Sequence, residues 1–190
     1  AGTYYFDELN FVAGGGGGGG GGTVAGLPID FDTAGVTYAL TGFGGAEDAT
    51  VVAGVAGANG SVARVVKSAT AELWAGTTVS TGANQSIATI PFTATARSMT
   101  LRVRAPAAGI VVRLKVEDAA DNTHTVETEA TTTVANAWET LTFNFANQAT
   151  GTAALNLAFT YNKASVFFAF GTTGAAGGAG THYFDELNFV

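Results

Sequence analysis

Apolar and polar residues alternate along most of this chain. The alternation is clearest in Thr100–Arg104, Val112–Glu117 and Trp138–Phe145, and short alternating runs rich in Val, Thr and Phe are typical of half-buried β-strands. Further candidates share this pattern or composition: Leu27–Asp32, Val36–Phe43, Thr50–Ala53, Val62–Ser68, Ala71–Thr78, Ser86–Phe92, Thr125–Glu129, Leu155–Thr160, Ser165–Gly171 and Tyr183–Val190. No segment keeps a 3.6-residue apolar period over three turns. The pattern predicts an all-β domain, an antiparallel two-sheet β-sandwich of the jelly-roll kind.

The chain begins with a near copy of its own ending. Tyr5–Val12 is identical to Tyr183–Val190, and Tyr4 stands where His182 stands. A repeat of this kind indicates a tandem array. We therefore interpret residues 1–12 as the last strand of a preceding copy, residues 13–23 as a polyglycine linker, and residues 24–190 as one complete module. Polyglycine has no side chains to bury, so the linker is expected to be a flexible tether.

Composition and charge narrow the function classes. Apolar residues make up 47% of the chain and charged residues 12%, which argues against intrinsic disorder. Fifteen acidic and eight basic residues give a net charge of −7, which offers a nucleic-acid partner no electrostatic support. The chain has no cysteine, and no apolar run approaches the roughly 20 residues of a membrane span. This composition suits a secreted or cell-surface protein.

One predicted hairpin gathers much of the charge. Val112, Leu114 and Val116 point to one face of a strand and Arg113, Lys115 and Glu117 to the other, with Glu127 and Glu129 on the strand after the turn. This set is either a solvated sheet face with cross-strand ion pairs or a polar platform that hydrogen-bonds a ligand rich in hydroxyls. Periodicity alone leaves both interpretations open.

Several short motifs, taken in order, resemble a known family. They are Glu72-Leu-Trp-Ala-Gly-Thr-Thr-Val79, Met99-Thr-Leu-Arg-Val-Arg104, Val112-Arg-Leu-Lys-Val-Glu-Asp118, Tyr161-Asn-Lys163 and Tyr183-Phe-Asp-Glu-Leu187. Residues 24–190 thus resemble the non-catalytic β-jelly-roll modules of secreted bacterial polysaccharide-degrading proteins, especially laminarinase-type β-1,3-glucanases. The resemblance implies a carbohydrate-binding module, often with a structural calcium ion, and does not settle which glycan is bound.

Sugar binding needs an aromatic face for the C–H surface of the ring and polar side chains for its hydroxyls. Trp74 is followed by the small residues Ala75 and Gly76, so it is either a binding platform or a half-buried core residue. Trp138 starts a strand, which favours a packing role over binding. Tyr161 is either a ligand contact or a loop plug. The predicted carbohydrate-binding residues are Trp74, Arg113, Lys115, Glu117, Glu127 and Tyr161.

Two carboxylates suggest a metal site. Asp32 lies in the first predicted strand and Asp185 in the last, and these terminal strands commonly lie side by side in jelly rolls. Calcium takes six to eight oxygen ligands, so Asp32 and Asp185 are expected to share a structural Ca²⁺ with loop carbonyls. The alternative is a turn cap or an exposed pair.

Catalysis has little support. Glu117 and Glu127 on paired strands are the only evident candidates for a glycosidase pair, but Arg113 and Lys115 beside them favour the ionised form and oppose a general-acid role. The chain is therefore not expected to be an enzyme. Two hypotheses stay open: a module that binds a neutral β-glucan such as laminarin, or a structural repeat of a bacterial surface adhesin or filament, joined to neighbouring copies by strand exchange.

Overall fold

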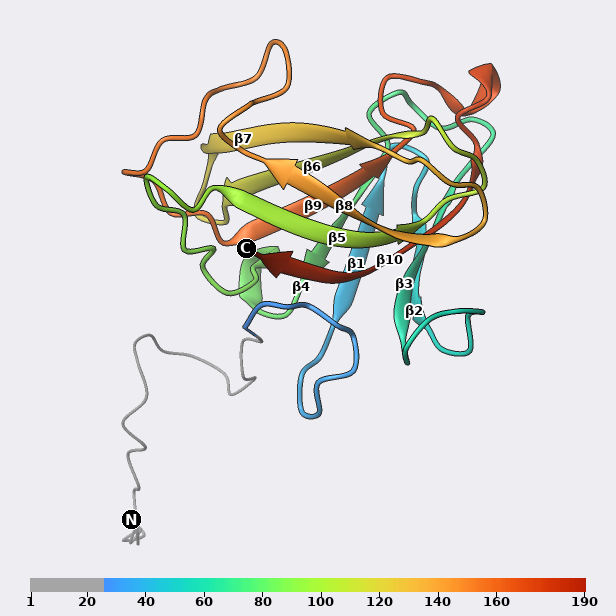
Figure 1. Ribbon diagram of the computed structural model, residues 1–190, viewed down its shortest axis with the longest axis horizontal. Helices are drawn as coiled ribbons and strands as arrows, with labels where there is room; N and C mark the ends of the chain where they lie inside the picture. Colours follow the sequence, from blue (N-terminus) through green and yellow to red (C-terminus); the bar gives the residue numbers. More distant parts are fainter. Residues whose placement is uncertain (1–25) are drawn as a thin grey trace, which may run out of the picture.

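The computed structural model describes residues 26–190, which form two five-stranded antiparallel sheets packed face to face (Figure 1). The first sheet has the order β1 (Ala39–Phe43), β4 (Gly76–Ser80), β9 (Lys163–Phe168), β6 (Val111–Asp118) and β7 (Asp121–Thr131). The second sheet has the order β2 (Asp48–Val52), β3 (Val62–Lys67), β10 (Gly180–Phe189), β5 (Ser98–Arg104) and β8 (Trp138–Asn144). The predicted β-sandwich is confirmed.

The core lies between the sheets and follows the two-residue period. On β6, Val112, Leu114 and Val116 are fully buried, and on β5 Leu101 and Val103 are fully buried. Burying one such side chain contributes about 1.5–3 kcal/mol. Because each inward residue is followed by an outward one, the same period places charged side chains of both strands on the outer faces of the sandwich.

Two predicted strands are wrong. Ser86–Phe92 and Leu155–Thr160 belong to no sheet, yet Ile87, Ile90 and Phe159 pack into or against the core. Ile87 and Ile90 each donate one backbone hydrogen bond, to Asn162 O and Tyr161 O. The alternation of apolar and polar residues in these two segments therefore reflects loops that lie along the core, not paired β-strands.

The beginning of the predicted module is also less regular than expected. Leu27–Asp32 is not a full strand, because only Ile29 bridges to the last strand, at Leu187. Within the predicted strand Ala71–Thr78, pairing starts at Gly76. The bridge still brings the first described residues beside β10 (Figure 1). The predicted strand of a preceding copy, residues 1–12, and the linker, residues 13–23, lie outside the described residues.

Within the part of the chain that the structure describes, the helical content is limited to two short 3-10 turns, η1 (Ala83–Gln85) and η2 (Gly174–Ala176). Between residues 26 and 190, no helix combines the length and hydropathy that a bilayer crossing requires.

Candidate functional site

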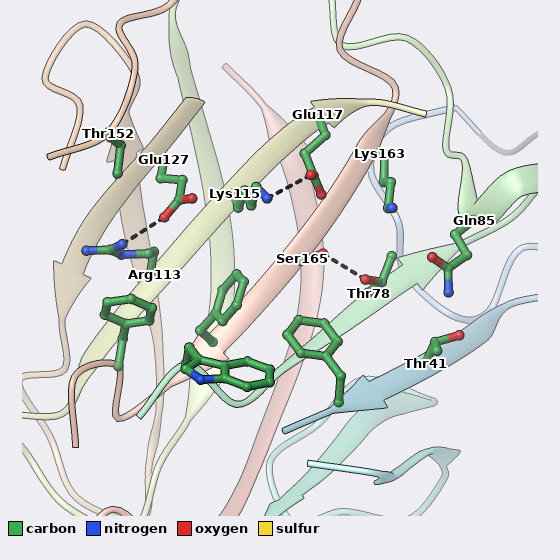
Figure 2. Close-up of a pocket in the computed structure, with 14 residues that line it drawn as sticks. Thr41, Thr78, Gln85, Arg113, Lys115, Glu117, Glu127, Thr152, Lys163 and Ser165 are labelled. Carbon is green, nitrogen blue, oxygen red and sulfur yellow. Dashed lines mark hydrogen bonds and ion pairs between the residues drawn. The ribbon is translucent and has the colours of Figure 1, made fainter. Parts of the chain in front are cut away.

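A groove crosses the outer face of the first sheet and encloses about 630 Å³. All five strands of the sheet contribute to it, together with loop residues at both ends (Figure 2). Aromatic, hydroxyl, amide and charged side chains line it: Thr41, Phe43, Trp74, Thr78, Gln85, Arg113, Lys115, Glu117, Glu127, Thr152, Lys163, Ser165, Phe167 and Phe170.

Strand register builds the middle of the groove as one polar row. Thr41 pairs with Thr78, Thr78 with Ser165, Ser165 with Lys115, and Lys115 with Glu127, so the row runs across β1, β4, β9, β6 and β7. The Thr78 and Ser165 hydroxyls are hydrogen-bonded at 2.8 Å (Figure 2). The floor of the groove is therefore a line of hydrogen-bonding groups on rigid strands.

The aromatic end of the groove contains Trp74 and three phenylalanines. Trp74 is 48% exposed and stacks on Phe43, with ring centroids 6.2 Å apart and an interplanar angle of 19°. Phe43 makes an edge contact with Phe167, which makes another with Phe170. A Cβ at Gly76 would lie 2.5 Å from the Phe167 ring and 2.8 Å from the Phe43 ring. Glycine at this position therefore permits the rings to converge beside an open indole face.

The charged end of the groove is internally paired. Arg113 Nη1 donates to Glu127 Oε2 at 2.7 Å and Arg113 Nη2 donates to Glu129 Oε1 at 2.6 Å. Lys115 Nζ lies 2.7 Å from Glu117 Oε1. These bonds fix the orientation of the polar side chains before a ligand binds, and they balance most of the charge (Figure 2).

Five of the six predicted sugar-binding residues meet in this groove: Trp74, Arg113, Lys115, Glu117 and Glu127. Tyr161 does not. Its side chain is 2% exposed, packs edge-on against Phe92, and its hydroxyl accepts a hydrogen bond from Asn156 N at 3.1 Å. The prediction of a direct ligand contact is thus wrong for Tyr161, and its alternative as a loop plug describes the structure.

Trp138 lies on the other sheet and serves packing. Its Nε1 donates to Ala56 O at 3.1 Å, and the guanidinium of Arg102 lies over its ring, 4.6 Å from the centroid. The bond to Ala56 O, together with the bond from Arg102 Nη2 to Gly57 O at 2.7 Å, holds the loop between β2 and β3 against the outer face of the second sheet. This agrees with the packing role that its position at the start of a strand favours.

Several groove residues escape sequence reasoning. Thr41, Thr78 and Ser165 are common strand residues, and only the register of five strands reveals that they form one row. Phe43 and Phe167 read as core residues, because phenylalanine in a strand is most often buried. Lys163 stands in the motif Tyr161-Asn-Lys163, and that motif was the signal that could have pointed to it.

The fold recurs in solved carbohydrate-binding modules. The family 11 carbohydrate-binding module of a cellulosomal cellulase of Clostridium thermocellum aligns with a TM-score of 0.54 and 13% identity over 87% of this chain and 93% of that chain. The family 11 module from Clostridium thermocellum in complex with a β-1,3-1,4-mixed-linked tetrasaccharide aligns with a TM-score of 0.53 and 13% identity over 85% and 92%.

A third structure, a carbohydrate-binding module of the β-sandwich superfamily, aligns with a TM-score of 0.50 and 12% identity over 86% of this chain and 61% of that chain. No protein-family model and no curated protein sequence matches the chain. At identities this low, the structural alignments establish a shared fold and nothing about function. The function of this chain therefore has to be argued from its own groove.

Of the predicted metal residues, Asp32 lies near the start of the described chain and Asp185 lies in β10. Asp185 is 1% exposed, accepts a hydrogen bond from Glu186 N at 2.8 Å, and lies 3.7 Å from Arg102 Nη1. Burial raises the pKa of Asp185 to about 6, and the charge of nearby Asp32 contributes to this rise. Both Asp32 carboxylate oxygens accept from Ser61 N, at 3.0 and 3.1 Å.

These two carboxylates fit only part of a calcium site. No cluster of three His, Cys, Asp or Glu side chains suited to a metal occurs in residues 26–190. Calcium takes six to eight oxygens, so the remaining ligands would have to be backbone carbonyls or water. The charge of Asp32 acts on buried Asp185 and favours a cation here, and the guanidinium of Arg102, 3.7 Å from Asp185, already supplies one positive charge.

Proposed function

We propose that residues 24–190 are a non-catalytic carbohydrate-binding module that binds a neutral β-glucan in its groove. The observation that carries this proposal is the combination of an exposed, stacked Trp74 with a preorganised polar floor in one open groove. The indole face covers the apolar C–H face of a pyranose ring, and the polar side chains replace the water bound to its hydroxyls.

The charge balance of the groove favours a neutral ligand. Arg113, Lys115 and Lys163 supply three positive charges. Glu117, Glu127 and Glu129 supply three negative charges, each within 2.7 Å of Arg113 or Lys115. An acidic polysaccharide would have to compete with these carboxylates for their cations. Sugar hydroxyls both donate and accept, so they can add to the paired groups without separating them.

The same pairing supports a binding role rather than catalysis. A glycosidase needs one carboxylic acid that stays protonated to act as a general acid. In this groove Glu127 pairs with Arg113 and Glu117 with Lys115, each at 2.7 Å, so both carboxylates are engaged by cations rather than free to face a glycosidic oxygen. We infer that neither glutamate donates a proton to a glycosidic bond.

A β-1,3-glucan such as laminarin is the favoured ligand. The motif resemblance points to laminarinase-type proteins, and the fold is shared with a module bound to a β-1,3-1,4-mixed-linked tetrasaccharide. We place the module in a secreted or cell-surface bacterial protein with tandem copies. Linked copies would raise the apparent affinity for a polymer through the effective concentration that the linker sets.

Calorimetric titration of the full chain with a laminarin-type oligosaccharide tests this proposal. We expect saturable heat, and an affinity at least about tenfold weaker in Trp74→Ala, a loss of about 1.4 kcal/mol. Leu73→Ala is the matched control, because Leu73 is 43% exposed and adjacent to Trp74 but lines no part of the groove. Absence of heat with laminarin, cellulose and xylan fragments, at concentrations that saturate known modules, contradicts a glucan site.

A second candidate function rests on the repeated segment. Tyr5–Val12 is identical in sequence to Tyr183–Val190, most of which forms β10, the central strand of the second sheet. The N-terminal segment of one copy is therefore chemically suited to the position of β10 in another, as in a filament or adhesin built by strand exchange. Light scattering at rising concentration tests it: oligomers that disappear when residues 1–23 are deleted support strand exchange, and a monomer throughout argues against it.

A further inference from the structure

A hollow opens on the outer face of the second sheet, on the opposite side of the sandwich from the groove. Strand register aligns Arg64, Tyr183, Arg104 and Trp138 in one row across β3, β10, β5 and β8. The hollow lies at the end of β5, encloses about 230 Å³ and is lined by Arg104, Ala105, Pro106, Asn136, Thr181 and Tyr183.

Arg104 differs from the other two arginines on this face. Arg64 donates to both carboxylate oxygens of Asp48, at 3.0 Å each. Arg102 donates to Gly57 O at 2.7 Å and lies 3.7 Å from Asp185. The guanidinium of Arg104 has no carboxylate within 4.0 Å among residues 26–190; its one hydrogen bond there runs from Nε to Asn136 O, at 3.0 Å. The hollow therefore contains a positive charge that no acidic side chain of the described chain neutralises.

The surrounding contacts hold Arg104 in place. Its Cζ lies 5.6 Å from the centroid of the Tyr183 ring. Asn136, which anchors Nε, donates through its backbone N to Ala105 O at 2.7 Å and through Nδ2 to Pro106 O at 3.2 Å. With Nε used, the two Nη groups form no hydrogen bond within residues 26–190 and leave one edge of the guanidinium for a ligand. Such an edge matches the geometry of a carboxylate.

The other polar groups of the hollow suit a sugar. Thr181 and Tyr183 line it, and their hydroxyls make no hydrogen bond within the described part of the chain. A volume of about 230 Å³ is below the roughly 300–1,000 Å³ of pockets for drug-sized ligands, which limits the occupant to a single ring. We propose that this hollow is a second saccharide-binding site, specific for a sugar unit that carries a carboxylate, such as a hexuronic acid.

The two faces then recognise different polysaccharides. The groove pairs two of its three cations, Arg113 and Lys115, with glutamates and favours a neutral chain, whereas the lining of the hollow contains a cation and no acidic side chain. Because the sites lie on opposite sheets, both can be filled at once. The module would connect a neutral glucan to an acidic polysaccharide, and the acidic site does not depend on the proposed function of the groove.

Two-dimensional NMR of the ¹⁵N-labelled full chain tests the site. The ligands are tetragalacturonic acid and its methyl-esterified form, which keeps the shape and removes the charge. With the acid we expect saturable chemical-shift changes at Arg104 Nε–H and at the backbone amides of Thr181 and Tyr183. The ester should bind about tenfold more weakly, and added salt should weaken binding of the acid. Arg104→Gln should abolish the shifts of the Thr181 and Tyr183 amides. Arg64→Gln is the control and should retain them, because Arg64 lies in the same row but is already paired with Asp48.

Four results would overturn the proposal. The ester binds as tightly as the acid, acetate at equal concentration gives the same shifts, Arg104→Gln binds like the wild type, or Trp74→Ala abolishes acid binding and so moves it to the groove. If Arg104→Gln does not fold, the comparison of acid and ester on the wild-type chain decides the matter. Laminarin titration of the same sample reports on the groove separately, so failure of one site is distinguishable from failure of the other.

Discussion

The guanidinium of Arg113 lies over the ring of Phe170, with Cζ 3.5 Å from the ring centroid, while Glu127 and Glu129 bind its edge. A planar cation held by its face and by its edge has little freedom to rotate. Its orientation in the groove is therefore set before a ligand arrives, which reduces the side-chain entropy lost on binding.

Arg113→Lys should weaken glucan binding by about tenfold, a loss of about 1.4 kcal/mol. Lysine keeps the charge but loses the planar fork and the stacking on Phe170. Titration calorimetry measures the affinity, and urea unfolding should show a stability loss of about 1 kcal/mol. Arg97→Lys is the control, because the Arg97 side chain makes one hydrogen bond within residues 26–190, to Thr93 O, and lines no part of the groove. Equal affinities of the wild type and Arg113→Lys would show that charge alone is recognised.

The charged part of the groove was predictable and the aromatic part largely was not. Arg113, Lys115 and Glu117 alternate with buried residues along β6, so a period of two identifies their common face. Phe43 and Phe167 alternate in the same way, but an outward phenylalanine is indistinguishable by sequence from an inward one when the register of its strand is unknown. The middle row of hydroxyls depends on pairing between strands far apart in sequence, which local pattern does not specify.

Tyr161 illustrates a different limit. Outside strands and helices no period relates a side chain to a face, so its position beside Asn162 and Lys163 indicated a surface loop without fixing where the ring points. Lys163 is the first residue of β9 and lines the groove, whereas Tyr161, two residues earlier, turns into the core.

Tyr161→Phe should lower stability and leave glucan affinity unchanged. The Tyr161 hydroxyl accepts from Asn156 N, and removing it leaves that N–H without its partner, which costs about 1–3 kcal/mol. Urea unfolding measures the cost and calorimetry measures the affinity. A substantial loss of affinity in a variant that unfolds like the wild type would return Tyr161 to the list of ligand contacts.

Calcium should stabilise the fold through Asp185. A ligand that binds only the folded state at a hundred times its Kd adds about 2.7 kcal/mol, which corresponds to roughly 5–10 °C in Tm for a chain of this size. We expect calcium to raise the Tm of chelator-treated protein and Asp185→Asn to remove the effect. Asp48→Asn is the control, because Asp48 is exposed and pairs with Arg64. An equal calcium response in Asp185→Asn would place the cation elsewhere.

Two buried groups should make stability depend on pH in opposite directions when calcium is absent. Burial, and then the charge of Lys67, lowers the pKa of His182 from 6.5 to about 4. The unfolded chain therefore binds the extra proton, and His182 makes stability fall as the pH falls from 6.5 to 4. Burial raises the pKa of Asp185 from 3.8 to about 6, so the folded chain binds the extra proton and stability falls as the pH rises from 3.8 to 6. Each effect amounts to about 3 kcal/mol.

Because the two effects nearly cancel, the wild-type unfolding free energy should change little between pH 4 and 6.5, and single substitutions should expose each slope. His182 stacks on Phe168 with ring centroids 4.5 Å apart, and His182→Phe keeps an aromatic ring in this position. This variant should lose stability as the pH rises. Asp185→Asn should lose stability as the pH falls. Urea unfolding at five pH values in calcium-free buffer measures both slopes, and parallel curves for the two variants would contradict this assignment of the titrating groups. Repeating the series with calcium should flatten only the slope of His182→Phe, because a bound cation keeps Asp185 ionised.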